Sequence, residues 1–158
     1  MSRDATFEEG REAPLNLGAM DADDLKVISA LVQDAVFAIT EMTWRPGQHR
    51  FGLLLNRFRW EDAAADTGRH APERVQSLLV IDGVLGVASQ GIDRRDREMI
   101  LSVLSVGFEP AEDGAGHVVL ILAGDGAVRL AVEALDVTLK DVTRPYIAPS
   151  GRAPGHSD

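Results

Sequence analysis

The sequence predicts an α+β, β-rich fold with one N-terminal helix and six to eight mostly antiparallel strands arranged in hairpins. Helical spacing of apolar residues occurs once, near the N-terminus, whereas most later segments alternate apolar and polar residues with period two. Glycine, proline and aspartate turn signals separate these segments. Sequential hairpins of this kind build a small barrel, a curled sheet or a sandwich, and the pattern leaves these three alternatives open.

The helix is predicted over residues 21–32. Asp21 is a residue type that caps helix N-termini, and Asp23 and Asp24 would lie in the first turn, near the positive end of the helix dipole. The apolar residues that follow at helical spacing are Leu25, Ile28, Leu31 and Val32.

The strongest local prediction is a hairpin of two long strands, residues 34–44 and 50–60, joined by a turn at Pro46-Gly47. Gly83 permits a bend after the next strand. The other predicted strands cover residues 74–82, 84–90, 99–109, 117–123 and 127–133.

The apolar residues change parity near residue 134. They occupy even positions over 128–132 and odd positions over 135–139, so a bulge or a break into a new strand is required if both sets face one core. A helix over 134–142 fits less well, because its apolar residues recur every second position and include β-branched types.

Composition bounds the organisation of the chain and the classes of chemistry open to it. The acidic segment 1–13 and the Pro/Gly-rich segment 143–158 are predicted to be flexible tails around a single β-rich domain, residues 14–142. The absence of cysteine excludes disulfides and thiol nucleophiles, and no apolar run approaches the ~20 residues of a membrane span. Cytoplasmic residence is the expectation, and the net charge of −9 argues against nucleic acid as a general partner.

Several segments of the sequence are similar to those of a known protein family. They are Asp24-Leu25 with residues 31–35, the stretch Phe51-Gly-Leu-Leu-Leu-Asn-Arg-Phe-Arg-Trp60, Gly91-Ile-Asp-Arg94, and residues 128–133 followed by Leu139-Lys-Asp141. Together they resemble an uncharacterised alphaproteobacterial family of small cytoplasmic proteins, classed as a domain of unknown function. The resemblance spans about residues 14–145 and implies one domain, but it brings no activity, ligand or catalytic residue.

The first candidate binding surface is the stretch 44–60, which contains four arginines and no acid. Arg57, Arg59 and Trp60 could bind a partner, an anion, or RNA or single-stranded DNA by stacking and phosphate contacts. The alternative is that the aromatic residues lie in the core while the arginines sit on the solvent face and pair with acids such as Glu41.

The second candidate is Gly91-Ile-Asp-Arg-Arg-Asp-Arg-Glu98. Here Arg94 could clamp a carboxylate or phosphate, and Asp93 and Asp96 could bind an ion or a cationic group. The alternative is a solvated turn whose charges neutralise one another, with Asp93 as a helix cap.

No catalytic residue, metal site or cofactor is predicted, because the sequence has no phosphate loop or nucleophile elbow, and its four histidines lack i, i+4 spacing. The first functional hypothesis is a non-enzymatic protein-interaction or adaptor domain that uses a sheet edge, with self-association as its simplest form. The alternatives are an anion-binding protein or an enzyme of unknown class, which requires a concave pocket, and an RNA or single-stranded DNA binder.

Overall fold

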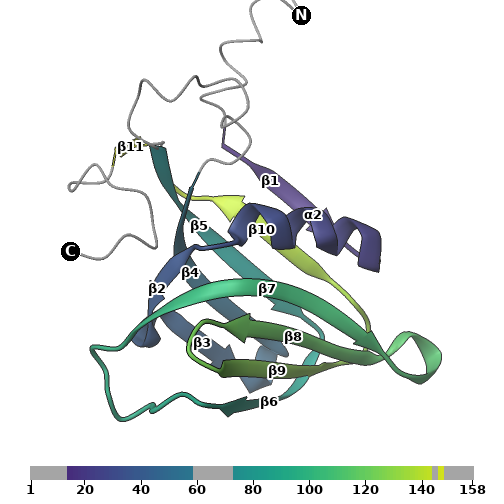
Figure 1. Ribbon diagram of the computed structural model, residues 1–158. Coiled ribbons are helices and arrows are strands. Elements are labelled where there is room, and N and C mark those ends of the chain that lie inside the picture. The colour runs from purple at the N-terminus through teal and green to yellow at the C-terminus, as the bar shows by residue number, and fades with distance from the viewer. Residues whose placement is uncertain (1–13, 59–72, 144–145, 148–158) are drawn as a thin grey trace, which may run out of the picture.

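The computed structural model describes residues 14–58, 73–143 and 146–147 (Figure 1). These residues form one α-helix, α2 (Ala22–Val32), and an 11-stranded antiparallel sheet. Residues 1–13 and 59–72 lie outside the described residues, as does most of the predicted C-terminal tail 143–158. The strands are β1 (Asn16–Ala19), β2 (Val36–Ala38), β3 (Met42–Arg45), β4 (Arg50–Phe58), β5 (Glu73–Asp82), β6 (Val84–Gln90), β7 (Ile100–Pro110), β8 (Gly116–Leu122), β9 (Gly126–Val132), β10 (Val137–Asp141) and β11 (Tyr146–Ile147).

The strands follow the order β1-β10-β5-β4-β2-β7-β8-β9-β6, with β11 paired to β5 and β3 paired to β4. Within the described part of the chain, β1 pairs with β10 and β6 with β9, and β1 and β6 are not paired with each other. The sheet is therefore open and is not curled into a barrel. This corrects the barrel and curled-sheet alternatives. The strand number exceeds the predicted six to eight because β1 and β11 are too short to show alternation, and because the single strand predicted over 34–44 is divided into β2 and β3.

The predicted helix is confirmed. The Asp21 side chain caps α2 by accepting a hydrogen bond from the Asp24 N–H at 2.8 Å. Leu25, Ile28 and Val32 are buried on the face that packs against β7 and β1. A single amphipathic helix thus covers part of the core face of the sheet.

The prediction of one long strand over residues 34–44 is wrong for the middle of that segment. A 3₁₀ turn, η1 (Ile39–Glu41), separates β2 from β3. Residues of β2 pair mainly with β7, whereas β3 pairs with β4, and the turn moves the chain from one partner to the other. The hairpin β3–β4 itself is confirmed, with the 3₁₀ turn η2 (Pro46–Gln48) followed by His49 in the left-handed region.

The parity change near residue 134 is explained by a new strand. β9 ends at Val132, and β10 leaves to pair with β5 and β1 instead of β8. Leu135, Val137 and Leu139 are buried in the same core as the inward residues of β9. Residues 137–141 are extended, in agreement with the rejection of a helix there.

Candidate ligand-binding site

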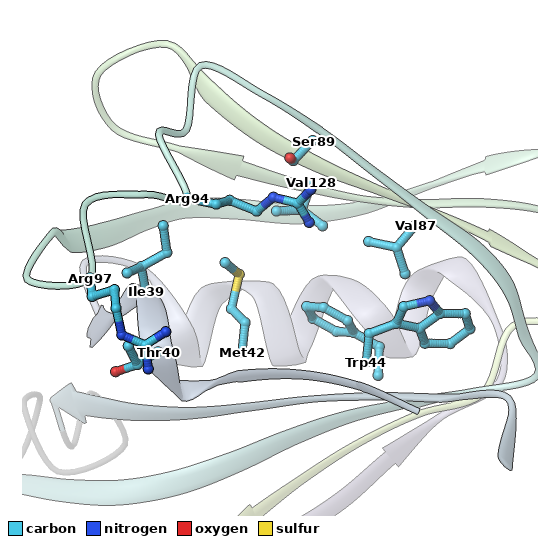
Figure 2. Close-up of a pocket in the computed structure, with 10 residues that line it drawn as sticks. Ile39, Thr40, Met42, Trp44, Val87, Ser89, Arg94, Arg97 and Val128 are labelled. Carbon is cyan, nitrogen blue, oxygen red and sulfur yellow. The ribbon is translucent and has the colours of Figure 1, made fainter. Parts of the chain in front are cut away.

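A pocket of about 330 Å³ lies between the β3–β4 hairpin and the β6–β9 pair (Figure 2). It is close to the low end of the size range of small-molecule sites. The side chains that line it are Ile39, Thr40, Met42, Trp44, Phe51, Val87, Ser89, Arg94, Arg97 and Val128.

The strand-borne walls of the pocket are mostly apolar because of strand alternation, and the hydroxyls of Thr40 and Ser89 also line it. Trp44 pairs with Phe51 across β3 and β4, and Ser89 pairs with Val128 across β6 and β9. Phe51 and Val128 are buried beneath, while Trp44 and Val87 are half-buried and face each other across the space in Figure 2. The pocket is thus an opening in the hydrophobic core with an indole in its wall.

Backbone contacts join the two walls at one end. The Val84 N–H donates to the His49 carbonyl at 2.9 Å, and His49 Nδ1 lies 3.2 Å from the Val84 carbonyl oxygen. Beyond this point β3 pairs only with β4, and β6 only with β9, among the described strands. The pocket therefore lies between two strand edges that are tied together at one end.

The loop 91–99, which connects β6 to β7, forms the other end of the pocket. Two consecutive turns shape it, with the Asp96 N–H donating to the Asp93 carbonyl and the Met99 N–H to the Asp96 carbonyl. The Asp93 carboxylate accepts from the Arg95 backbone N–H at 3.1 Å and from Arg95 Nε at 3.2 Å. The loop is neither a helical turn nor a helix start, so Asp93 stabilises a turn instead of capping a helix.

Gly91 fixes the start of this loop. Its φ is +69°, and a Cβ on it would lie 2.5 Å from the Asp125 carbonyl oxygen in the β8–β9 turn. Glycine is therefore required both by the left-handed backbone and by the close approach of a second chain segment. This contact fixes the loop in place beside the pocket.

Arg94 and Arg97 both reach the pocket from this loop. In Figure 2, Arg94 extends over the pocket near Ser89, and Arg97 lies beside Thr40 at the end far from Trp44. Neither guanidinium has a hydrogen bond or ion pair with any described residue, and the lining contains no acid. Two guanidiniums without a described partner thus border a mostly apolar space.

Arg57 has the opposite environment. Its side chain is fully buried, and its Nη2 donates to both carboxylate oxygens of Asp141 at 3.0 Å. Nε donates to the Ser77 hydroxyl at 3.0 Å, and that hydroxyl donates to Asp141 Oδ1 at 2.7 Å. The Leu15 N–H also donates to Asp141, at 2.9 Å. We refer to Arg57, Ser77 and Asp141 as the buried cluster.

The buried cluster corrects the expectation that Arg57 lies on the solvent face. It ties β4, β5 and β10 together and reaches the residue preceding β1. A guanidinium enclosed in this way is not exposed to a ligand, so a binding role for Arg57 is not favoured. Arg59 and Trp60, which were predicted beside it, lie outside the described residues.

Of the predicted site residues, the structure places only Arg94 in the pocket. Asp93 is half-exposed and pairs with Arg95. Sequence reasoning missed Trp44 and Arg97 as pocket residues. Both belong to segments that were singled out, but only the folded chain places the β3–β4 hairpin and the 91–99 loop around one pocket, with Trp44 and Arg97 at opposite ends of it.

Other site types find no support within the described ranges. No group of three or more histidine or acidic side chains could hold a metal ion there. No helix in that part of the chain has the length and hydropathy needed to cross a bilayer.

Comparison with protein families gives a match over most of the chain. Residues 15–156 match the family model described as "Protein of unknown function (DUF2948)". The chain belongs to the DUF2948 family. No curated protein and no solved structure matches the sequence. For this DUF2948 protein the pocket and its surroundings must therefore be interpreted from their own chemistry.

Proposed function

We propose that this protein is a binding module for a small amphipathic anion, which it holds in the pocket between β3 and β6. The observation that carries the proposal is the pair Arg94 and Arg97, two guanidiniums without partners in the described structure, beside an apolar pocket without an acid. Guanidinium groups form charge-assisted, often bidentate hydrogen bonds with carboxylates and phosphates. An apolar ligand body would lie against Trp44 and Val87, and its anionic group would meet the arginines.

Binding is favoured over catalysis by the lining residues. The hydroxyls of Thr40 and Ser89 line the pocket, but no described lining side chain is a histidine or carboxylate that could act as their base. Of the alternative that joined an anion-binding protein with an enzyme of unknown class, we therefore propose the binding protein and not the enzyme. The ligand is expected to be cytoplasmic, in keeping with the compartment that the sequence predicts and with the alphaproteobacterial origin that the resemblance implies.

Nucleic acid fits the pocket less well. Trp44 could stack on a base, but the lining offers few polar groups for base edges, and the chain carries a net charge of −9. An aromatic or aliphatic acid matches both the apolar wall and the two cations.

The test uses calorimetric titration with 1-naphthylacetate and with 1-naphthylacetamide, which keeps the apolar body and removes the charge. Wild type is expected to bind the acid at least about tenfold more tightly than the amide, since charge-assisted hydrogen bonds contribute about 1.5–3 kcal/mol. The Arg94→Ala/Arg97→Ala variant is expected to lose this preference.

Arg95→Ala is the matched control, because it removes the same charge from the same loop but not from the pocket lining. It is expected to retain the preference for the acid. Equal binding of acid and amide by wild type, or an equal loss in Arg95→Ala, would reject the proposed function.

A further inference from the structure

We infer that the physiological occupant of the pocket is the C-terminal end of a partner protein, added in extended form along the free edge of β6 with its carboxylate at Arg94 and Arg97. This inference rests on the proposed function and names the class of ligand. It also unites the anion-binding proposal with the sheet-edge interaction predicted from the hairpin pattern.

The edge of β6 has unpaired backbone groups beside the pocket. The Glu133 N–H donates to the Gly83 carbonyl, which shows that the odd-numbered residues of β9 turn their backbone groups toward β6. Continuing along β9, Arg129 and Ala127 lie opposite Ala88 and Gln90. Because hydrogen-bonded and non-hydrogen-bonded pairs alternate in an antiparallel ladder, these pairs are hydrogen-bonded.

The intervening residues Val87 and Ser89 therefore direct their N–H and C=O groups away from β9. The Val84 N–H also points away from β9, and it is satisfied by the His49 carbonyl. No described strand pairs with β6 on the side of Val87 and Ser89. These two residues provide two donors and two acceptors in the row that an added strand requires.

The same two residues connect this edge to the pocket, since the side chains of Val87 and Ser89 both line it. A strand added to β6 would thus lie along the pocket mouth, and its alternate side chains would point toward Trp44, Met42 and Phe51. Backbone hydrogen bonds and an apolar side-chain pocket would then act on one extended peptide, which is the usual division of roles in strand addition.

Charge and chain direction specify the end of the peptide. β6 runs from Val84 toward Gln90, and the arginine loop follows immediately. A peptide parallel to β6 would end at Arg94 and Arg97, where its terminal carboxylate would find two cations. A single terminal charge also suits a body of net charge −9 better than a run of acidic side chains would.

The test is fluorescence anisotropy with a labelled peptide, Gly-Ser-Gly-Thr-Phe-Thr-Val, with either a free C-terminal carboxylate or a C-terminal amide. The free acid is expected to bind at least about tenfold more tightly than the amide. Arg94→Ala/Arg97→Ala is expected to abolish that difference, and Arg95→Ala to preserve it.

Amide hydrogen exchange by NMR tests the strand itself. Bound peptide is expected to slow exchange at Val87 and Ser89, with little change at Ala88, whose amide already bonds to β9. Peptide binding without this alternation would overturn the inference, as would equal binding of acid and amide.

If naphthylacetate binds and the free-acid peptide does not, the inference fails and the proposed function stands. If neither binds, both fail. A concentration-dependent dimer that protects the same two amides without peptide would assign the edge to a second copy and overturn the inference.

Discussion

The protein uses arginine in two opposite ways. Arg57 is fully buried and hydrogen-bonded to Asp141, Ser77 and the Phe58 carbonyl. Arg94 and Arg97 border an apolar pocket with no partner among the described residues. A buried cation must be compensated at high cost, whereas an exposed one remains hydrated and available to a ligand. The presence of a preformed partner, and not the residue type, separates structural arginine from candidate binding arginine here.

The largest expected effect on stability comes from a substitution in the buried cluster. Asp141→Ala leaves the Arg57 guanidinium buried without its carboxylate and removes the acceptor of the Leu15 N–H. We expect the free energy of unfolding, measured by urea denaturation, to fall by about 3–5 kcal/mol. The exposed pair Arg50–Asp82 provides the control, since Asp82→Ala should cost at most about 1 kcal/mol. Equal losses in the two variants would show that Arg57 is not held as described.

A double substitution tests whether the unpaired buried charge causes the loss of stability. Arg57→Met/Asp141→Leu removes both charges together and replaces them with apolar groups, which is often neutral or stabilising for a buried ion pair. The double variant should regain at least about 2 kcal/mol relative to Asp141→Ala in the same urea experiment. A double variant as unstable as Asp141→Ala would mean that the hydrogen bonds that the Ser77 hydroxyl and the Leu15 N–H lose with Asp141 matter more than the buried charge.

A substitution at Gly91 is expected to have an intermediate effect on stability. Gly91→Ala places a Cβ against the Asp125 carbonyl in a left-handed backbone, so we expect a loss of about 1–3 kcal/mol in the free energy of unfolding. Because the substitution displaces the start of the 91–99 loop, naphthylacetate affinity should also fall. Gly114→Ala is the control: it has a similar positive φ of +82° but nothing within 4 Å, and it lies far from the pocket in the sequence. Unchanged naphthylacetate binding in Gly91→Ala would show that the loop does not position the arginines.

The smallest effect on stability is expected at the pocket arginines. Arg94→Ala/Arg97→Ala removes two side chains without described partners, so the free energy of unfolding should change by no more than about 0.5 kcal/mol per residue. A destabilisation as large as that of Asp141→Ala would indicate that these arginines are structural after all, and the contrast with Arg57 would disappear.

The local features that were predicted correctly are those that depend on nearby residues. The Asp21-capped helix, the Pro46-Gly47 hairpin and the break after Val132 each follow from spacing within a few residues. The division of 34–44 by a 3₁₀ turn was missed, because it depends on β2 and β3 having different partners. The open order of the sheet was missed for the same reason, since β10 pairs with β5 and β1 across a long sequence separation.

The sequence by itself determined the helix, most strands and the charged composition of the 91–98 segment, because capping, periodicity and turn chemistry are local properties. Tertiary structure decided which arginines have hydrogen-bond and ion-pair partners. The Arg57–Asp141 pair spans 84 positions, and Trp44 of β3 and Arg94 of the 91–99 loop line one pocket although they are distant in the sequence. Burial and proximity in space set the environment of a charge, and neither can be read from its neighbours along the chain.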